Sequence, residues 1–132
     1  EDIAARTKAL TQGKGVAVVF DSVGKDSFDA SLNSLAARGF FVSFGQTTGH
    51  PPPVAGATLQ KLGSLYFTRP TLVTYTADVS DLRASANMVF DKLMRGVIQV
   101  AIRQRYSLKD AAKAHQALQG GTTSGSSVLI PD

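Results

Sequence analysis

The chain has 132 residues, of which 43% are hydrophobic and 18% are charged, and these values suit a folded domain rather than a disordered segment. It contains no cysteine, which excludes disulfides, thiolate metal sites and cysteine nucleophiles and is compatible with a cytoplasmic location. No apolar run approaches the ~20 residues that a membrane-spanning helix needs. The 14 basic residues outnumber the 10 acidic ones, but they are scattered, so the excess predicts an ordinary solvated surface.

The first third of the chain predicts a strand–helix–strand unit. Residues 2–10 have helical spacing, and because that pattern is already under way at the first residue we expect the chain to be part of a longer protein. Residues 16–20 are a continuous β-branched and aromatic run, which is typical of a strand buried on both faces. A helix is expected over 25–39 and a second apolar strand over 40–44. In such a unit the two strands are expected to be parallel and the crossover between them right-handed.

Five further elements follow the polar, proline-rich loop at 45–56. They are an edge strand over 64–73, a long amphipathic helix within 77–97 whose end Gly96 marks, a half-exposed strand over 98–106, a helix over 107–119 and a last strand over 126–130. Pro70 lies inside the first of these, and proline is tolerated only at a sheet edge or a strand end. The order of elements predicts an α/β fold with a parallel sheet.

Open α/β sheets bind ligands outside the carboxyl ends of their strands. This rule selects residues 21–24, 44–47 and 68–71 as candidate ligand positions. Gly45 has no Cβ and would let a flat ligand lie against the backbone, and Arg69 could supply a cation for an anionic group. Neutral hydrogen bonds would come from the side chains of Ser22, Gln46 and Thr47. A flat polar ligand that carries phosphate fits this set, although a glycine after a strand is more often only a turn.

Most known catalytic motifs are absent from the sequence. Neither a G-x-G-x-x-G fingerprint nor a Walker A motif follows a predicted strand, and no G-x-S-x-G elbow occurs. His50 and His115 lie far apart in sequence, and a structural role is the more common one for such isolated histidines. We therefore identify no catalytic residue and no metal site from the residues alone.

Three segments together carry a family resemblance that spans essentially the whole chain: "VVFDSVGKDSFDASLNSLAARGFFVSFGQTTG", "LQKLGSLYFTRPTL" and "YSLKDAAKAHQALQGGTTSGSSVLIP". The chain resembles the C-terminal part of NADPH-dependent quinone oxidoreductases, the zeta-crystallin-like, zinc-free members of the medium-chain dehydrogenase/reductase superfamily. The resemblance implies that residues 1–96 are the second half of a Rossmann NADPH-binding domain. It also implies that residues 97–132 return to a GroES-like catalytic domain, and that the glycine-rich pyrophosphate turn lies upstream.

The resemblance also implies which residues contact the cofactor. They come from three matching stretches and are Ser22, then Phe44, Gly45, Gln46 and Thr47, and finally Arg69, Pro70 and Thr71. Relatives often carry a basic residue shortly after the helix that contains "AHQALQ", where this chain has Gly121, so one cofactor contact is absent or replaced here.

The implied reaction is hydride transfer from NADPH to a quinone or an activated enone, without a metal. Catalysis would rest on proximity and orientation, and the 132 residues alone are expected to be inactive. The edge strand between Ser64 and Leu72 is expected to pair with its mate in a homodimer. Two alternatives stay open: an enoyl or enone reductase of the same superfamily, and an RNA-binding module related to zeta-crystallin.

Overall fold

The computed structural model describes residues 1–131 and confirms an α/β fold built on parallel sheets. The chain forms two compact units, Glu1–Asp81 and Leu82–Asp132. Each unit has its own sheet, three-stranded in the first and two-stranded in the second, and all strand pairs in both sheets are parallel. Among the helices of the described residues, none is long and apolar enough to cross a membrane.

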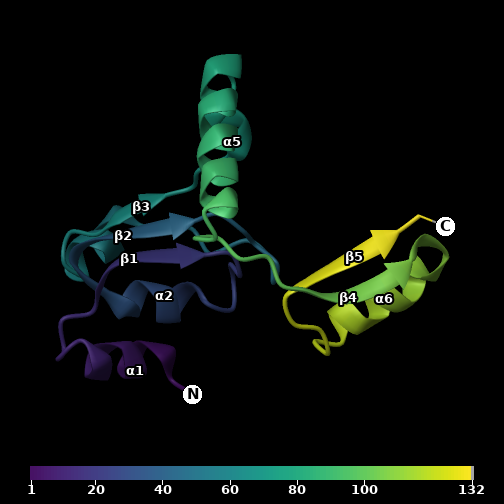
Figure 1. Cartoon of the computed structure of the whole chain (residues 1–132). Coiled ribbons are helices and arrows are strands. Elements are labelled where there is room, and N and C mark those ends of the chain that lie inside the picture. Colours follow the sequence, from purple (N-terminus) through teal and green to yellow (C-terminus); the bar gives the residue numbers. More distant parts are fainter. Residues whose placement is uncertain (132) are drawn as a thin grey trace. The chain divides into compact units, whose positions relative to one another are not determined.

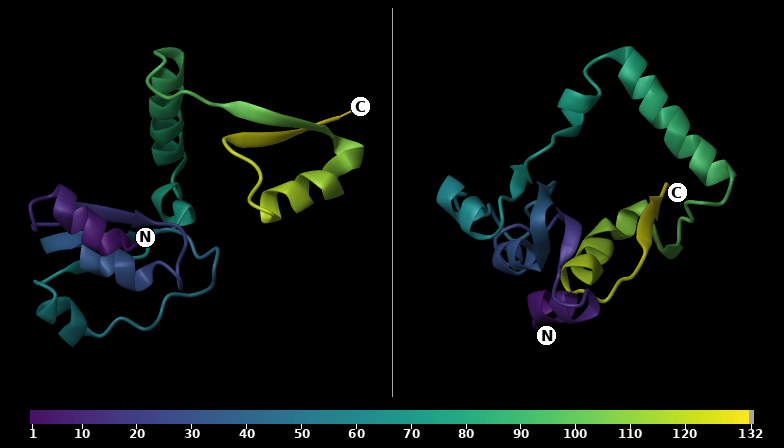
Figure 2. Two further views of the ribbon diagram at one scale, coloured as in Figure 1. Left: turned by 90° about the horizontal axis from the view of Figure 1, so that it is seen from below. Right: turned by 90° about the vertical axis from the view of Figure 1, so that its left-hand side faces the viewer.

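The first unit is a three-stranded sheet with helices on one face (Figure 1). Its strands are β1 (Val16–Asp21), β2 (Leu35–Ser43) and β3 (Tyr66–Thr68), in the spatial order β1-β2-β3. Helices α1 (Ile3–Leu10) and α2 (Phe28–Ser34) lie on the same side of this sheet, as the two further views in Figure 2 also show. Because the strands are parallel, their carboxyl ends reach the same edge of the sheet.

The hydrophobic core lies between the sheet and α2. It contains Phe28, Leu32, Leu35, Phe41 and Leu65, all of which are buried. The ring of Phe28 meets that of Phe41 edge-on, with their centroids 5.6 Å apart. The same core residue Phe41 is in register with a residue of β1 on one side and of β3 on the other, so the core ties all three strands together.

The opposite face of the sheet carries exposed apolar side chains. They are Val18 and Phe20 of β1, Phe40 of β2 and Tyr66 of β3. The rings of Phe40 and Tyr66 stack with centroids 4.5 Å apart and their planes 9° from parallel. The alternation of side chains along a strand explains the division, because successive residues point to opposite faces.

Two of the expected elements end earlier than the sequence predicts. The helix expected over 25–39 ends at Ser34, because Leu35 takes an extended backbone and pairs with Val16 in the sheet. The strand expected over 64–73 ends at Thr68, and residues Leu72–Tyr75 form a short helix, α4. The latter prediction was wrong because Pro70 has no N–H for a sheet ladder and the chain turns away after it.

The second unit is built around strands β4 (Ile102–Ser107) and β5 (Ser126–Ile130). Helix α6 (Ala111–Gln119) connects them after a 3₁₀ turn at Leu108–Asp110. Strand β4 begins at Ile102, four residues after the start of the strand expected over 98–106. Helix α5 (Val79–Met94) precedes it and ends, as predicted, just before Gly96, whose φ of 69° is left-handed.

Candidate functional site

The loops that follow β1 and β2 are bonded to each other through their main chains. The carbonyl of Asp21 accepts from the N–H of Phe44 at 2.8 Å and from that of Gly45 at 3.3 Å. The carbonyl of Ser22 accepts from the N–H of Thr47 at 3.3 Å, and the next carbonyl, of Val23, accepts from Thr48 at 2.9 Å. We call residues 21–24 and 44–49 together the paired loops. Four of the eight predicted site residues take part in these bonds: Ser22 as an acceptor, and Phe44, Gly45 and Thr47 as donors. The two loops at this sheet edge therefore form one hydrogen-bonded structure.

The paired loops are anchored by the buried carboxylate of Asp21, the last residue of β1. Its Oδ1 accepts from the N–H groups of Val23 and Gly24, both at 2.9 Å. Its Oδ2 accepts from the hydroxyls of Ser27 and Ser31, both at 2.6 Å. Burial alone raises the pKa of this carboxyl, but the hydroxyls of Ser27 and Ser31 and the two backbone N–H groups together outweigh it, and the pKa lies below its ordinary value of 3.8. The group is therefore an ionised hydrogen-bond acceptor at neutral pH.

The backbone of the other loop leaves no room for a Cβ at Gly45. A Cβ on Gly45 would lie 2.7 Å from Cα of Ser22 and 2.9 Å from its carbonyl carbon, and would also collide with its carbonyl oxygen. All three are backbone atoms, which cannot swing aside as a side chain can. The sequence-based reason for this glycine, a flat ligand against the backbone, therefore has a competing explanation in the packing of the two loops.

Arg69 joins the end of β3 to the loop after β2. Its Nη1 donates to the carbonyls of Ser43 at 2.8 Å and Gly45 at 3.1 Å, and its Nη2 donates to Oε1 of Gln46 at 3.3 Å. The guanidinium thus holds two predicted site residues while remaining exposed itself. A planar group with five N–H donors can make these bonds and still present a positive charge to a ligand.

The remaining predicted residues differ in how they relate to this edge. Ser22, Gln46 and Thr47 have exposed side chains beside the paired loops. Phe44 is 53% exposed. Pro70 and Thr71 follow β3, but the hydroxyl of Thr71 pairs with that of Thr74 at 2.8 Å, which turns it toward α4.

Gly121, where relatives were expected to carry a basic residue, has a structural reason to be glycine. It follows α6 with a left-handed φ of 64°, and its N–H donates to the carbonyl of Leu118 at 3.2 Å. This conformation suits glycine best, because a Cβ is disfavoured there. The residue ends the helix, and it offers no charged side chain to a ligand.

A hollow of about 440 Å³ adjoins Gln46 and Arg69 at the ends of β2 and β3. Its other walls are His50, the three prolines at 51–53, Val54 and Phe67. Its size falls within the usual range for small-molecule sites, ~300–1,000 Å³. The sequence pattern predicts a structural role for His50 and a loop for the prolines, and the signal that indicates a site is their position shortly after the predicted contact residues 44–47.

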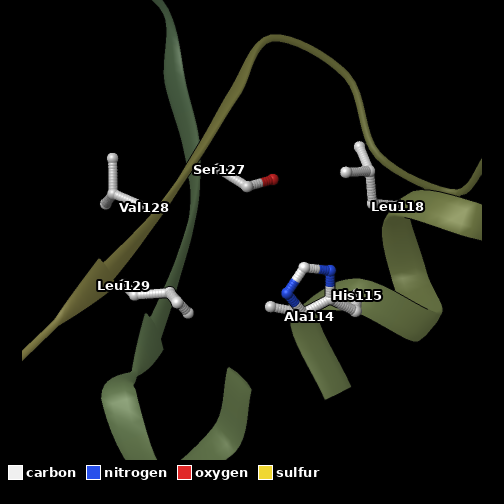
Figure 3. A pocket seen from close by; sticks show the side chains of 6 residues that line it. All are labelled: Ala114, His115, Leu118, Ser127, Val128 and Leu129. Atoms are coloured by element: carbon white, nitrogen blue, oxygen red, sulfur yellow. The ribbon is translucent and has the colours of Figure 1, made fainter. Parts of the chain in front are cut away.

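A smaller hollow, of about 170 Å³, lies in the second unit between α6 and β5 (Figure 3). Ser127 and Leu129 point into it from the strand, and Ala114, His115 and Leu118 face it from the helix (Figure 3). Its lining is largely apolar, and it contains none of the predicted site residues. Within residues 1–131 no group of three or more His, Cys, Asp or Glu lies close enough together to bind a metal ion.

Comparison with known proteins places the chain in a family. Residues 1–129 match the family described as zinc-binding dehydrogenase. A quinone oxidoreductase of Salmonella typhimurium is 47% identical over 99% of this chain, and a 2-haloacrylate reductase of a Burkholderia species is 36% identical over 99%. The crystal structure of Escherichia coli quinone oxidoreductase complexed with NADPH superposes with a TM-score of 0.90 at 44% identity, over 99% of this chain and 41% of the other. The chain spans about 40% of the length of the curated relatives it matches.

Proposed function

Because the chain belongs to the zinc-binding dehydrogenase family, we propose that residues 1–132 form the C-terminal part of an NADPH-dependent quinone oxidoreductase, below called the full-length reductase. The observation that carries this proposal is the identity of 44–47% to quinone oxidoreductases over almost the whole chain. The α/β architecture and the ligand-sized hollow at the carboxyl ends of the strands support it.

The residues at this edge fit the nicotinamide half of NADPH. That half carries a neutral carboxamide and ribose hydroxyls next to anionic phosphate. Exposed Ser22, Gln46 and Thr47 offer neutral hydrogen bonds, and Arg69 offers a cation beside the hollow of about 440 Å³. We propose that Ser22, Phe44, Gly45, Gln46, Thr47 and Arg69 hold the cofactor, with Pro70 and Thr71 contributing main-chain contacts because the Thr71 hydroxyl is bonded to Thr74.

NADPH, when bound, supplies a hydride from its nicotinamide ring. The residues of this chain bind and orient the ring instead of reacting with it. Gln46 is held by Arg69, and the Thr47 N–H is held by Ser22, so both contacts are preorganised before a ligand arrives. Fixed orientation of this kind raises the rate by holding the reactants in a productive geometry. We propose that no metal takes part, in keeping with the zinc-free relatives that the sequence resembles.

The proposed domain division is residues 1–96 in the dinucleotide-binding domain and residues 97–132 in a GroES-like catalytic domain. On this proposal the 132 residues alone lack part of the cofactor site and are inactive, and the full-length reductase is cytoplasmic. Calorimetric titration of the isolated chain with NADPH tests the point. Tight binding with one cofactor per chain would contradict it.

The activity is tested directly on the full-length reductase. We expect it to oxidise NADPH in the presence of 1,4-benzoquinone, followed as the loss of absorbance at the nicotinamide band, with NADH as the matched control cofactor. A protein that binds NADPH but transfers no hydride to any quinone would refute the quinone reductase proposal while leaving the cofactor proposal in place.

The identity of 36% to a 2-haloacrylate reductase supports a second candidate substrate class, activated enones and acrylates. Both substrate classes present an electron-poor carbon to the same hydride donor, so this edge serves either one. Steady-state kinetics of the full-length reductase with 1,4-benzoquinone and with 2-chloroacrylate separates them. The substrate with the higher kcat/KM is the better assignment.

We also propose a homodimer that forms through the edge strand between Ser64 and Leu72. Strand β3 pairs with β2 on one side, and self-pairing about a two-fold axis would cover its other side. Leu65 is buried and Phe67 stacks on Phe41, so charged substitutions at those positions would damage the core as well. Tyr66 is 54% exposed and is the better position for testing the edge.

A further inference from the structure

The carboxylate of Asp21 connects three separate pieces of the first unit. It ends β1, bonds the N–H groups of the turn at Val23 and Gly24, and bonds the hydroxyls of Ser27 and Ser31 on the α2 side. Only 4% of the residue is exposed. A buried carboxylate that accepts four hydrogen bonds from fixed donors has little freedom to move, so it fixes the direction in which the chain leaves the strand.

The turn that Asp21 holds in place is hydrogen-bonded to the second loop through main-chain groups. The carbonyls of residues 21, 22 and 23 accept from the N–H groups of Phe44, Gly45, Thr47 and Thr48. Gly24 meets the second loop at a distance where a Cβ would lie 2.9 Å from Cα of Gln46 and would collide with the carbonyl oxygen of Gly49. The two loops are in close contact, so a shift of the first turn displaces residues 44–49 as well.

We propose that Asp21 is a positioning residue for the cofactor. It does not contact the ligand; its ionised side chain holds the turn at 22–24, and through it the loop at 44–49, in the arrangement that places Ser22, Gln46 and Thr47 at the ligand edge. This inference rests on the proposed function. The strand-end rule selected residues 21–24 only as candidate ligand positions, and the inference adds the positioning role of the Asp21 carboxylate.

Ser31 allows the role of Asp21 to be tested at a second residue. It lies on α2, ten residues from Asp21, and its hydroxyl donates to Oδ2 at 2.6 Å. No other part of this side chain is needed at the ligand edge, so its effect on the cofactor must pass through Asp21. If that is so, the two residues are coupled and their effects do not add.

The test uses the full-length reductase with Asp21→Asn, Ser31→Ala and the double variant. Asparagine keeps the shape of the aspartate side chain and one accepting oxygen. Its NH₂ group replaces Oδ2, which in the wild type accepts from the hydroxyls of Ser27 and Ser31. Asp29→Asn is the matched control, because Asp29 is an exposed acid in the first turn of the same helix. Measurements are the Kd of NADPH by fluorescence titration, KM and kcat, the melting temperature, and amide hydrogen exchange of residues 44–48 without cofactor.

We expect Asp21→Asn to raise the Kd and KM for NADPH about tenfold, the loss that corresponds to one charged hydrogen bond, and to speed exchange of the amides at 44–48. Ser31→Ala should raise the Kd about threefold in the wild type and leave it unchanged in the Asp21→Asn background. Asp29→Asn should match the wild type in every measurement.

A merely structural role gives a different pattern. In that case Asp21→Asn lowers the melting temperature and the active fraction, but the folded protein binds NADPH with the wild-type Kd and KM, and the inference is overturned. Additive effects of Asp21→Asn and Ser31→Ala overturn it as well. A wild-type protein that does not bind NADPH refutes the proposed function and this inference together, whereas wild-type binding without quinone turnover refutes only the activity.

Discussion

Replacing Gly45 with alanine places a methyl group against the backbone of Ser22. The new Cβ would lie 2.7 Å from Cα and 2.9 Å from the carbonyl carbon of Ser22, and would collide with its oxygen. Overpacking of this kind costs about 1–3 kcal/mol. Alanine also reduces the entropy of the unfolded chain, which returns about 0.4–1 kcal/mol. The difference between the two effects is about 0–2.6 kcal/mol, and we expect Gly45→Ala to lower the free energy of unfolding by its central value, about 1.3 kcal/mol.

Gly56→Ala is the matched control. Gly56 begins α3 (Gly56–Lys61), and a Cβ there would meet nothing within 4 Å. The same entropy effect, with the better helix propensity of alanine, should stabilise the protein by about 0.4–1 kcal/mol. The two variants thus make the same chemical change and have opposite expected signs.

Urea unfolding of the full-length reductase without cofactor measures both effects. If Gly45 is needed because two loops meet there, the loss of stability must be present before any ligand binds. If Gly45→Ala unfolds at the same urea concentration as the wild type and only its NADPH affinity falls, the glycine serves the ligand directly and the packing argument is refuted.

Three further predictions concern the same unit of the full-length reductase. Asp21 has a lowered pKa in the folded state, so its contribution to stability is complete above the unfolded value of about 3.8 and is lost as the pH falls through the lower folded pKa. The difference in unfolding free energy between the wild type and Asp21→Asn should therefore be constant near neutral pH and shrink in acid urea titrations. Arg69→Lys loses the fork that bonds Ser43, Gly45 and Gln46, and KM for NADPH should rise about tenfold while Lys61→Arg, an exposed control, leaves KM unchanged. Tyr66→Asp places a charge on both copies of the edge strand and should convert a dimer to a monomer in sedimentation velocity; a dimer that persists would contradict the proposed interface.

The order of elements could be predicted from the sequence because its signals are local. The β-branched and aromatic run at 16–20 lies in β1, residues 40–43 lie in β2, and Gly96 follows α5 as expected. The prediction that residues 16–20 are buried on both faces was wrong for this chain, because Val18 and Phe20 are exposed on the face opposite the core. The end of α2 could not be predicted, because Leu35 leaves the helix to pair with Val16, a contact between residues 19 positions apart in sequence. Helical periodicity continues through Leu35, and only the tertiary pairing decides its conformation.

The position of the candidate site could be predicted from the sequence, but the contacts that hold its residues in place could not. The strand-end rule selected residues 21–24 and 44–47, and the structure brings these two segments together. The rule did not identify the carboxylate of Asp21 as a structural centre, because its four donors come from the turn and the following helix. It also passed over His50, which lines the hollow only because the proline-rich loop folds back beside Phe67 and Arg69.

The bonds between the paired loops use main-chain groups, which every residue type except proline can provide. What restricts the sequence is therefore the space between the loops and the one side chain that fixes the turn. A Cβ at Gly24 or Gly45 would collide with backbone of the opposite loop, and Asp21 accepts four hydrogen bonds that a neutral side chain cannot all accept. The exposed side chains of Ser22 and Thr47 carry no such constraint. The geometry of the edge thus depends on Asp21 and on the glycines where the two loops meet, and on our proposal the exposed polar residues determine which ligand it binds.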